Sequence, residues 1–575
     1  MAFWAWLDRG LWFFGDEWDF LVDRGLGAPP ASTHSIWFPH NEHWSTLPVL
    51  AWRALFAVWH LSSYWPYLAL LFAVQVALLH LAWRACRRAG ADTWISTAAV
   101  LLLGLLGAGA EDWGWAFQVG FAGSVCFGLL AMDLLDRDER GFLDRDGRSS
   151  GPGWRRRELA VSCALLASLM CSTVGDAMVV GAAVTAFARF GWRQAARALW
   201  APVVCYAVWF AGVGRLGLAA HSDHFSLATF TGLPGYLWQG LSSALGQVAG
   251  LGSLGPALLV GLVAWLAWHG RELWTRRPVL AGLCAAAVSF YGLVGVGRDT
   301  AGPPDASRYT YVAFAVLLPV VASVLSAPLG RAPMAGRAVA ACLLLFVTLG
   351  DVGQAKAWVS ARSALTSRLK EQLFAVGELV SAGVPDVSGP GAAPVPGDPN
   401  LQVADIARLE REGFLPRPPL SAVALSNARA VLALGVWNGL DMTLSRAPLF
   451  APRLQLVAAH FAARGPGRGS CATFSPQTLS PPMSLLLRVP ARARSASVLL
   501  AAGPAGAASA ARHVDAFFVP AHGPSSTTPI DLAFPAGGRG WLDDNAPGSA
   551  VVLDWTGPGP LYVCGQGRPA LSTRR

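Results

Sequence analysis

Two pairs of adjacent carboxylates stand beside tryptophan residues in this sequence. Asp16 and Glu17 lie in the segment GDEWDFL, and Glu111 and Asp112 lie in the segment GAEDWGW. Both segments border apolar runs, where a carboxylate is costly to remove from water, so acids kept there are candidates for chemistry. A carboxylate in such a place can act as a general base and accept a proton from a hydroxyl group. The alternative is that both pairs only cap helices or mark the membrane surface.

A dense polar cluster follows the first acidic pair in the segment WFPHNEHW. His40, Glu42 and His43 stand there between two tryptophans. Histidine donates hydrogen bonds to sugars and phosphates, and an indole ring offers a flat face to a sugar. Two histidines with a glutamate between them are also typical of part of a metal site, but no third ligand is evident, so no metal site is predicted.

Two arginines stand at the ends of later apolar runs. Arg298 lies in VGVGRDT, and Arg308, followed by Tyr309, lies in ASRYTY. A guanidinium group at the mouth of a membrane helix is suited to hold a phosphate through paired hydrogen bonds. The alternatives are a salt bridge with Asp299 or Asp305, or a side chain that extends to the membrane surface only to keep its charge in water.

The composition of the chain excludes an ordinary soluble protein. Of 575 residues, 54% are hydrophobic and only 14% are charged, against about 25% charged in a typical globular domain. The apolar residues gather in long runs that a bilayer must cover. Its two lysines, Lys356 and Lys370, lie outside any G-x-x-x-x-G-K motif, which excludes an ATP-driven transporter with its own P-loop. The arginines are spread over short loops, which argues against nucleic-acid binding.

The apolar runs predict an all-α, polytopic membrane domain with about ten transmembrane helices. Polar residues at 172–176 separate the fourth run from the fifth, and both are short, which favours a tilted or partly re-entrant pair. The ten predicted helices lie near residues 66–83, 94–110, 114–132, 159–174, 177–190, 199–214, 252–268, 279–296, 310–327 and 338–351.

Arginine is distributed unevenly over alternate loops, which predicts the orientation of these helices. One set of loops holds 18 arginines, at 84–88, 137–157, 189–197, 271–277 and 331–337. The opposite set holds only 5 arginines, two of which are Arg298 and Arg308. The arginine-rich set is expected to face the cytoplasm. Both acidic pairs and the histidine cluster are then expected outside the cytoplasm.

The N-terminal segment 1–14 is apolar but too short to span a bilayer, and Asp8 and Arg9 interrupt it. The arginine distribution nevertheless places residues 15–65 outside the cytoplasm. Either this segment is an aromatic helix in the membrane interface, or a first membrane helix lies upstream of Met1. We favour the second.

The composition changes after the last apolar run. Leucines at helical spacing predict a helix over 354–383, a Pro/Gly-rich linker follows at 384–400, and LQVADIARLEREGFLP predicts a short amphipathic helix. From about residue 441 short apolar runs alternate with Gly and Pro, which is typical of a small, sandwich-like, mainly β domain. The predicted domains are a membrane domain over 1–353, an extracytoplasmic helical and Pro/Gly-rich connector over 354–440, and an extracytoplasmic β-rich domain over 441–575.

Two cysteines, Cys471 and Cys564, fall in the C-terminal domain, whereas the other seven lie in or beside membrane segments. An even pair in an extracytoplasmic domain is a candidate disulfide, and the sequence leaves open whether the two are bonded.

Taken together, these motifs resemble those of the GT-C superfamily of integral membrane glycosyltransferases. GDEWDFL, followed by FPHNEHW and a membrane helix, resembles the first outside loop of that superfamily. EDWGWAFQ stands at the position of the second loop, and ASRYTY resembles the arginine-containing start of a later helix. The resemblance covers about residues 15–350. The first loop of the superfamily follows a membrane helix, and this chain departs from the pattern there.

The resemblance implies an enzyme that moves a sugar from a polyprenyl-phosphate carrier to a glycan, lipid or protein acceptor outside the cytoplasm. Such a transfer needs a carboxylate to take the acceptor proton and a positive site for the leaving phosphate. The resemblance implies Asp16 as the general base, with Glu17 as the close second. Glu111 or Asp112 would orient the acceptor or support a divalent metal, so the cofactor stays open.

The resemblance also implies a substrate-binding set in which the arginines hold the lipid phosphate and the aromatic rings face the sugar. Its members are His40, Glu42, His43, Arg298, Arg308, Tyr309 and Trp113.

Two other functions compete with a transferase. A transporter or flippase of lipid-linked sugars would place ionisable residues midway through its helices. Within the apolar runs we find few polar residues beyond Gln75, His80, Gln118 and Asp176, whereas polar residues crowd the outer face. The other alternative is a non-catalytic membrane protein that binds cell-wall polymer, for which the acids in the loops would be dispensable.

Overall fold

The computed structural model describes residues 1–24, 36–136, 152–219, 227–298, 303–383, 401 and 403–421, a few positions from 424 to 428, and the backbone of strands between 434 and 564. These residues form two compact units. Unit 1 consists of Met1–Leu11, Asp23–Trp59 and Ser63–Ala364, and unit 2 of Trp12–Val22, His60–Ser62 and Leu365–Arg575.

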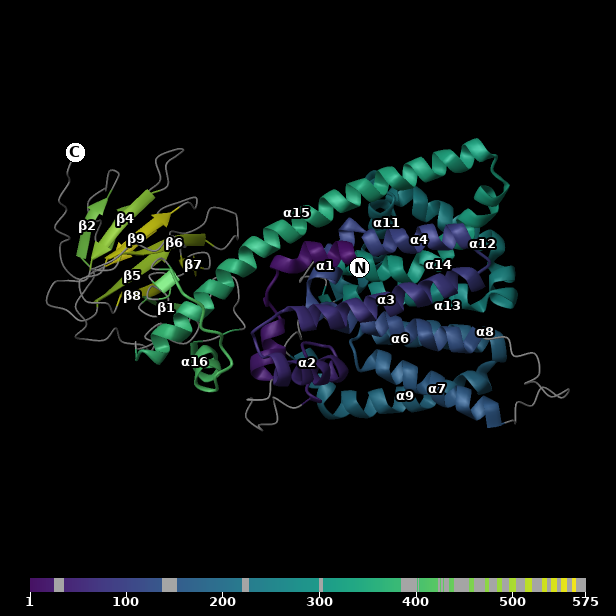
Figure 1. Cartoon of the computed structure of the whole chain (residues 1–575), viewed down its shortest axis with the longest axis horizontal. Coiled ribbons are helices and arrows are strands. Elements are labelled where there is room, and N and C mark those ends of the chain that lie inside the picture. Colours follow the sequence, from purple (N-terminus) through teal and green to yellow (C-terminus); the bar gives the residue numbers. More distant parts are fainter. Residues whose placement is uncertain are drawn as a thin grey trace. The chain divides into compact units, whose positions relative to one another are not determined.

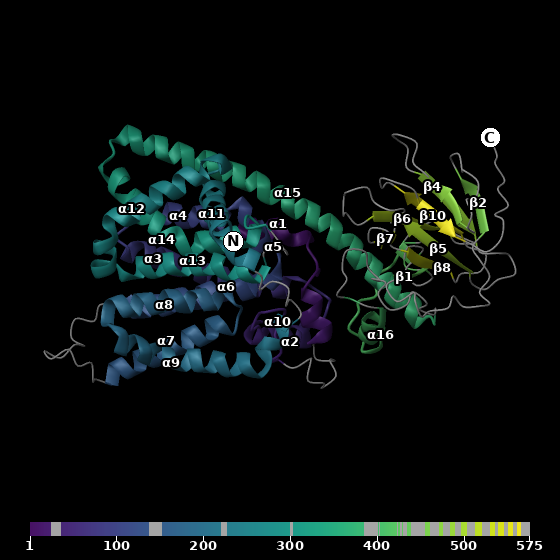
Figure 2. The same ribbon diagram turned by 180° about the vertical axis from the view of Figure 1, so that it is seen from behind.

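Unit 1 is built from helices, and α3, α6, α8, α13 and α14 run along a common direction in both views (Figures 1 and 2). The helices are α1 (Ala2–Leu7), α2 (Thr46–Trp59), α3 (Trp65–Arg88), α4 (Thr93–Leu105), α5 (Ala110–Gly114), α6 (Val119–Asp136), α7 (Pro152–Leu169), α8 (Val174–Phe190), α9 (Trp192–Trp209), α10 (Arg215–Ala219), α11 (Leu227–Val248), α12 (Gly255–Arg276), α13 (Pro278–Arg298), α14 (Ser307–Arg331) and the first part of α15 (Met334–Ser381). Short 3-10 or π turns are η1 (Asp8–Gly10), η2 (Asp19–Asp23), η4 (Gly107–Gly109), η5 (Ala116–Gln118), η6 (Phe210–Gly214) and η8 (Gly252–Leu254).

Among the described residues, seven helices are long and apolar enough to cross a membrane, or eight if one bent pair is counted as a single span. The seven correspond to seven of the predicted runs, and the bent pair corresponds to the run at 94–110. The two remaining runs, at 159–174 and 177–190, form α7 and α8, which fall outside that count. All ten predicted runs are therefore helical, and the chain is a multi-pass membrane protein.

The second apolar run is broken, although the sequence predicted one continuous helix there. The chain leaves the helical conformation at Leu106 and bends by 51° before α5. Glycine permits a close approach at this point, because a Cβ at Gly109 would overlap the ring of Tyr311 and a Cβ at Gly107 would overlap the backbone of Asp351. The acidic segment that follows forms the helix α5, rather than the tight loop expected from the sequence.

Helix α6 lies in the core of unit 1. In the most apolar window of the span Ala116–Asp136, 83% of residues are buried, compared with 17% for Gly252–Arg276 and 11% for Met334–Ser381. Small residues let neighbouring helices approach α6, as where Gly120 lies against the backbone of Cys171. A helix that is apolar on all sides and buried on all sides is a core helix. The less covered helices present their apolar side chains to lipid.

Three features of the helical unit differ from the sequence prediction. The last apolar run and the helix predicted over 354–383 form one 48-residue helix, α15, because Gly350 and Gly353 alone do not interrupt it. Helices α2 and α11 were not predicted. Helix α2 has only 14 residues, and α11 contains Pro234 together with glycines that dilute its apolar pattern.

Unit 2 contains the second part of α15 and the helix α16 (Val403–Arg411). The predicted amphipathic helix is confirmed, since Val403, Ile406 and Leu409 are buried at a spacing of three residues. Gly377 of α15 allows this contact, because a Cβ at Gly377 would lie 3.6 Å from Cγ2 of Ile406. The ring of Phe374 lies 5.5 Å from that of Trp12 in an edge-to-face contact within the same unit.

Ten strands follow α16 in the described backbone. They are β1 (Leu434–Asn438), β2 (Gln455–Ala459), β3 (Cys471–Phe474), β4 (Met483–Arg488), β5 (Ala496–Ala502), β6 (Arg512–Val519), β7 (Ile530–Phe534), β8 (Arg539–Asp544), β9 (Ala550–Trp555) and β10 (Leu561–Cys564). They pair antiparallel in two five-stranded sheets, with orders β1-β8-β5-β10-β3 and β2-β4-β9-β6-β7. Their side chains lie outside the described residues, so the sandwich-like packing stays a prediction.

The register of β3 and β10 bears on the candidate disulfide. The two strands pair antiparallel, with Cys471 directly opposite Cys564. Their side chains are outside the described part of the chain, and the disulfide stays a prediction.

Candidate functional site

An ion pair joins two of the predicted site residues in unit 1. Arg308 donates a hydrogen bond from Nη1 to Oε1 of Glu111 over 3.0 Å. The side chains are 24% and 15% exposed, respectively, so the pair is half-buried but still reached by water. Glu111 comes from helix α5, and Arg308 comes from the first turn of α14.

A chain of hydrogen bonds fixes the start of α14 against α5. Ser307 donates from Oγ to the carbonyl oxygen of Ala108 over 2.7 Å. Tyr311 donates from its hydroxyl to Oε1 of Gln75 over 2.7 Å, and Nε2 of Gln75 donates to the carbonyl oxygen of Asp112 over 2.9 Å. Gln75 comes from the middle of α3. Three helices thereby hold the acidic segment in one place.

Several buried polar atoms around α5 lack partners. Oδ2 of Asp112, Nε1 of Trp113 and Oε1 of Gln118 have no hydrogen-bond partner within the described part of the chain. Each of these side chains is almost completely buried. Buried polar atoms are nearly always paired in folded proteins, so a group of unpaired ones marks a place that water or a ligand completes.

The ring of Trp113 is buried and contacts two other aromatic rings. It stacks parallel to Trp4 with 5.4 Å between ring centroids, and Phe72 lies 6.2 Å away at a tilt. Nε1 of Trp4 donates to the carbonyl oxygen of Gly104 over 2.7 Å, which fixes the stack. The sequence suggested that Trp113 offers a face to a sugar, and this packing leaves no open face. Its unpaired Nε1 is the group still available for a hydrogen bond.

Asp8 is a buried acid that the sequence analysis treated only as an interruption of an apolar segment. Its side chain is 1% exposed, and neither carboxylate oxygen has a partner among the residues described. Burial raises the pKa of Asp8 to about 8. The carboxyl lies beside α5, because a Cβ at Gly114 would be 3.3 Å from its Oδ1. A lone acid inside a run of aromatic residues was the signal available in the sequence.

Asp351 of α15 is a second acid that the sequence did not single out. Its Oδ1 accepts a hydrogen bond from the backbone N–H of Gly107 over 3.0 Å, at the break between α4 and α5. Trp358 of the same helix lies against Gly114, since a Cβ there would be 2.7 Å from its ring. Helix α15 therefore supports the bent segment from outside. No local pattern predicts this role, because Asp351 is more than 200 residues away from the bend.

The histidine cluster forms a tight turn packed on the start of α6. His40 and His43 exchange both backbone hydrogen bonds, over 3.0 and 2.8 Å. The rings lie 5.1 Å from Phe117 and 5.5 Å from Phe121, respectively. Both histidines are buried, whereas Glu42 lies 3.5 Å from Nε2 of His43 and is partly exposed. The turn therefore holds its histidines in fixed positions beside the helix that begins after Gln118.

His43 is also fixed from the opposite side. Its Nδ1 lies 2.6 Å from Oγ1 of Thr173, in the turn between α7 and α8. Close by in sequence, Asp176 accepts a hydrogen bond from the hydroxyl of Tyr206 over 2.9 Å. The polar break that separated two short apolar runs in the sequence thus anchors the histidine turn.

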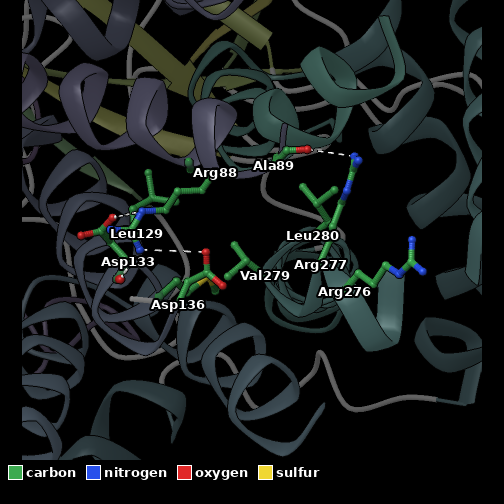
Figure 3. Close-up of a pocket in the computed structure, with 11 residues that line it drawn as sticks. Arg88, Ala89, Leu129, Asp133, Asp136, Arg276, Arg277, Val279 and Leu280 are labelled. Carbon is green, nitrogen blue, oxygen red and sulfur yellow. Dashed lines mark hydrogen bonds and ion pairs between the residues drawn. The ribbon is translucent and has the colours of Figure 1, made fainter. Parts of the chain in front are cut away.

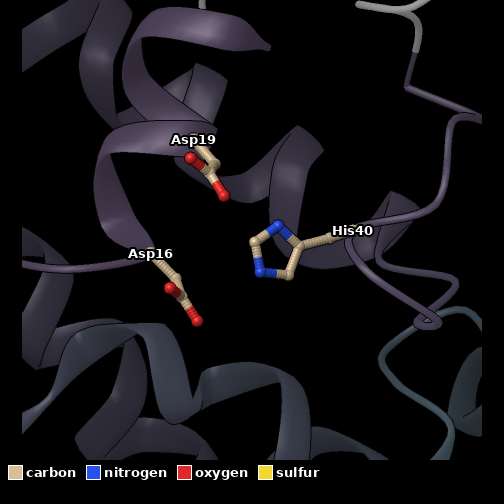
Figure 4. A group of neighbouring side chains, drawn as sticks. All are labelled: Asp16, Asp19 and His40. Atoms are coloured by element: carbon tan, nitrogen blue, oxygen red, sulfur yellow. The ribbon is translucent and has the colours of Figure 1, made fainter. Parts of the chain in front are cut away.

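The first acidic pair belongs to unit 2. Glu17 is buried, and its Oε2 accepts a hydrogen bond from the backbone N–H of Phe14 over 3.0 Å, so it closes its own turn. Asp16 is half-buried, and one of its carboxylate oxygens lies within 4.8 Å of one from Asp19. Figure 4 shows both carboxylates extending from neighbouring turns of the chain.

The predicted residues are thus distributed over several places. Glu111, Asp112, Trp113, Arg308 and Tyr309 share one region of unit 1, at α5 and the start of α14. The histidine turn packs on α6 in the same unit. Asp16 and Glu17 lie in unit 2. The side chain of Arg298 and the histidine-containing segment 220–226 lie outside the described residues.

No protein-family model matches this chain, and no curated protein matches it significantly.

Proposed function

We propose that this protein is a membrane glycosyltransferase of the GT-C type, which moves a sugar from a polyprenyl-phosphate carrier to an extracytoplasmic glycan, lipid or protein. The observation that carries the proposal is the half-buried ion pair between Arg308 and Glu111, beside the unpaired carboxyl oxygen of Asp112. A phosphate-binding cation and spare carboxyl groups in one region are the two requirements of such a transfer.

In this proposal Arg308 is kept in place by Glu111 until a donor arrives. A lipid-linked phosphate would compete with Glu111 for the guanidinium group, which has further donor atoms beyond the Nη1 that holds Glu111. The carboxylate released from the pair would then be free to bind a hydroxyl group of the acceptor. Asp112 would complete its own hydrogen bonding at the same time, because its Oδ2 lacks a partner in the described residues.

The general base is proposed to be Asp16. Unlike Glu17, which closes its own turn, Asp16 is half-buried and stands beside a second carboxyl group, Asp19. A carboxylate that water still reaches can accept a proton from a hydroxyl group. In the reaction Asp16 would take the proton from the acceptor hydroxyl as its oxygen forms a bond to the anomeric carbon of the sugar, while the bond from that carbon to the phosphate oxygen breaks and the polyprenyl phosphate leaves with its electrons.

The finer parts of the topology belong to the same proposal. The unequal arginine content of the loops orients the arginine-rich helix ends towards the cytoplasm. The connector and the β-rich domain over 441–575 would then lie outside, with a sandwich-like arrangement of the two sheets. There the domain would recognise a glycan or shape the acceptor groove.

Arg308→Ala tests the phosphate site directly. Binding of a synthetic polyprenyl phosphate to the purified full chain in nanodiscs should weaken by about 30-fold or more, because truncating a partly buried charge contact has a large effect. Arg215→Ala is the matched control, since Arg215 is an exposed arginine predicted on the same side of the membrane. Equal affinities for the wild type and Arg308→Ala would show that Arg308 does not bind the phosphate of the donor.

Asp16→Asn tests the reaction itself. Membranes supplied with a panel of polyprenyl-phosphate-linked sugars should lose sugar transfer, while the abundance of the protein stays unchanged. Retained turnover in this variant would reject Asp16 as the base. Movement of the donor across the membrane without any transfer would instead support the flippase alternative.

A further inference from the structure

A second charged region lies at the arginine-rich end of unit 1, away from the site proposed for transfer. A shallow, partly open hollow with an enclosed space of about 30 Å³ lies there, between the ends of α3 and α6 and the junction of α12 with α13. Figure 3 shows Arg88, Asp133 and Asp136 on one side of the hollow and Arg276 and Arg277 on the other. Small and apolar side chains form the rest of its lining.

The two acids of the hollow are already engaged by arginines. Asp133 lies 3.0 Å from Nη2 of Arg84 and 3.1 Å from Nε of Arg88. Asp136 lies 2.5 Å from Nη1 of Arg189 and 3.9 Å from Arg88. Two aspartates therefore share three arginines. These three arginines compensate the negative charge of the two aspartates.

The opposite side adds two further arginines. Arg277 donates from Nη1 to the carbonyl oxygen of Ala89 and to Oγ of Ser323, both over 2.9 Å, and its Nη2 lies 3.8 Å from the half-exposed Glu272. Arg276 is exposed and has no partner among the residues that the structure describes. Among the described residues, the lining of the hollow holds three arginines and two aspartates, and Arg84, Arg189 and Glu272 lie beside it, so arginines outnumber carboxylates in this described part of the chain.

The surroundings favour a ligand that comes from the bilayer. Arg88, Asp136 and Arg276 are each the last residue of their helices, so the hollow lies where membrane helices end. Helix α12 is among the least buried of the spans, as expected of a helix whose apolar side chains lie against lipid. Basic pockets between membrane helices on the cytoplasmic side are suited to anionic lipid headgroups, and a buried acyl chain would follow the apolar lining.

We propose that this hollow binds a phosphate group, and that its source is the headgroup of an anionic phospholipid in the cytoplasmic leaflet. Arg277, held by Ala89 and Ser323, supplies a fixed guanidinium group, and Arg276, whose side chain extends away from the two aspartates in Figure 3, supplies an unengaged one at the rim. A soluble phosphate ester is the other source of the same chemistry. The site is independent of the transfer reaction proposed above, because its lining comes from the ends of α3 and α6 and the α12–α13 junction and shares no residue with α5 or the start of α14.

Arg276→Glu tests the proposal with little risk to the fold, since Arg276 makes no contact that the change would break. Binding of short-chain phosphatidylglycerol to the purified full chain in detergent, measured by calorimetry, should weaken about tenfold or more. Arg271→Glu is the matched control, because it makes the same charge change at an exposed position of the same helix outside the hollow. Equal melting temperatures of the three proteins would show that the fold is kept.

The outcomes distinguish the sources of the phosphate. Binding of phosphatidylglycerol but not of phosphatidylcholine, lost in Arg276→Glu alone, supports the lipid site. Binding of glycerol phosphate or inorganic phosphate with the same dependence on Arg276 supports a site for a soluble phosphate ester. Equal weakening in both variants would mean general surface attraction, and no weakening in either would mean no site; each of these results overturns the proposal.

Discussion

Both ends of unit 1 bring arginines beside carboxylates, but they differ in how completely the polar groups are paired. Where α3 and α6 end, Asp133 binds two arginines, Arg84 and Arg88, and each interaction is within 3.1 Å. Where α5 lies against the start of α14, a single pair joins Glu111 to Arg308. Beside that pair, Asp112 keeps one carboxyl oxygen without a partner in the described part of the chain.

The difference separates a structural use of charge from a functional one. A fully paired cluster stabilises helix ends, because removing any member leaves a charge without compensation. Unpaired polar atoms in a buried region lower stability, and proteins keep such groups chiefly at functional sites. The contrast predicts that acids at the α5 end matter more for activity than for stability, and that acids at the α6 end behave in the opposite way.

Asp112→Asn should have the largest effect on function. The amide keeps the shape of the side chain and is easier to bury than a carboxyl group that needs to ionise. We expect transfer activity to fall by about 100-fold or more, while the melting temperature stays equal to that of the wild type or rises. The rate of sugar transfer is measured with lipid-linked donors in membranes. An unchanged rate would show that Asp112 has no role in the reaction.

Asp133→Asn should show the reverse pattern. The change leaves Arg84 and Arg88 without their shared carboxylate, and both arginines are about a third exposed, so water compensates in part. We expect a loss of about 2–4 kcal/mol of stability with little change in the catalytic rate of the folded fraction. Denaturant unfolding in detergent measures the loss of stability, and the specific activity of the folded protein measures the catalytic rate. A stable but inactive variant would contradict the comparison.

Gly109→Ala tests the close contact that positions α5. The new methyl group would overlap the ring of Tyr311, so the contact between α14 and the bend must shift. We expect a loss of about 1–3 kcal/mol. Gly292→Ala in α13 is the matched control, because nothing lies within 4 Å of a Cβ at Gly292, and there the change should be neutral or stabilising. Equal melting temperatures for the two variants would show that the bend tolerates a wider spacing.

Asp8 should show its effect as a dependence of stability on pH. Its pKa rises from 3.8 in the unfolded chain to about 8 in the fold. Between these values the folded state keeps a proton that the unfolded state has lost, so this carboxyl makes stability fall as the pH rises from about 4 to about 8.

Asp8→Asn cannot ionise and should remove that contribution. The variant should match the wild type near pH 4 and exceed it by about 1–3 kcal/mol near pH 9. Thermal unfolding across this pH range measures the difference. Parallel pH profiles for the two proteins would show that Asp8 is solvated or paired in the folded state.

The sequence predicted a large part of the helical unit because hydropathy is a local property. Each of the ten apolar runs forms a helix, and the amphipathic α16 is where its spacing placed it. The break before α5 was missed, since it depends on how Tyr311 and Asp351 pack against two glycines that are remote from them in sequence. Helix α11 was missed because Pro234 and its glycines lower the apolar signal without preventing the helix.

The sequence predicted several residues of the candidate site, but not which of them contact one another. Glu111 and Arg308 stood out as residue types at the ends of apolar runs, yet only packing brings them to 3.0 Å across 197 residues. Asp8 was overlooked because one acid in an aromatic segment carries no spacing that indicates burial. Whether Asp16 meets these groups stays a prediction.

The sequence by itself determined that this is a multi-pass membrane protein, because apolar length and charge content fix which solvent a segment requires. It also determined which side chains are available for chemistry. The tertiary structure decided which arginine binds which carboxylate, which acids are buried without partners, and where the second apolar helix bends. These features depend on contacts between residues far apart in the chain, and no local pattern of residue types contains them.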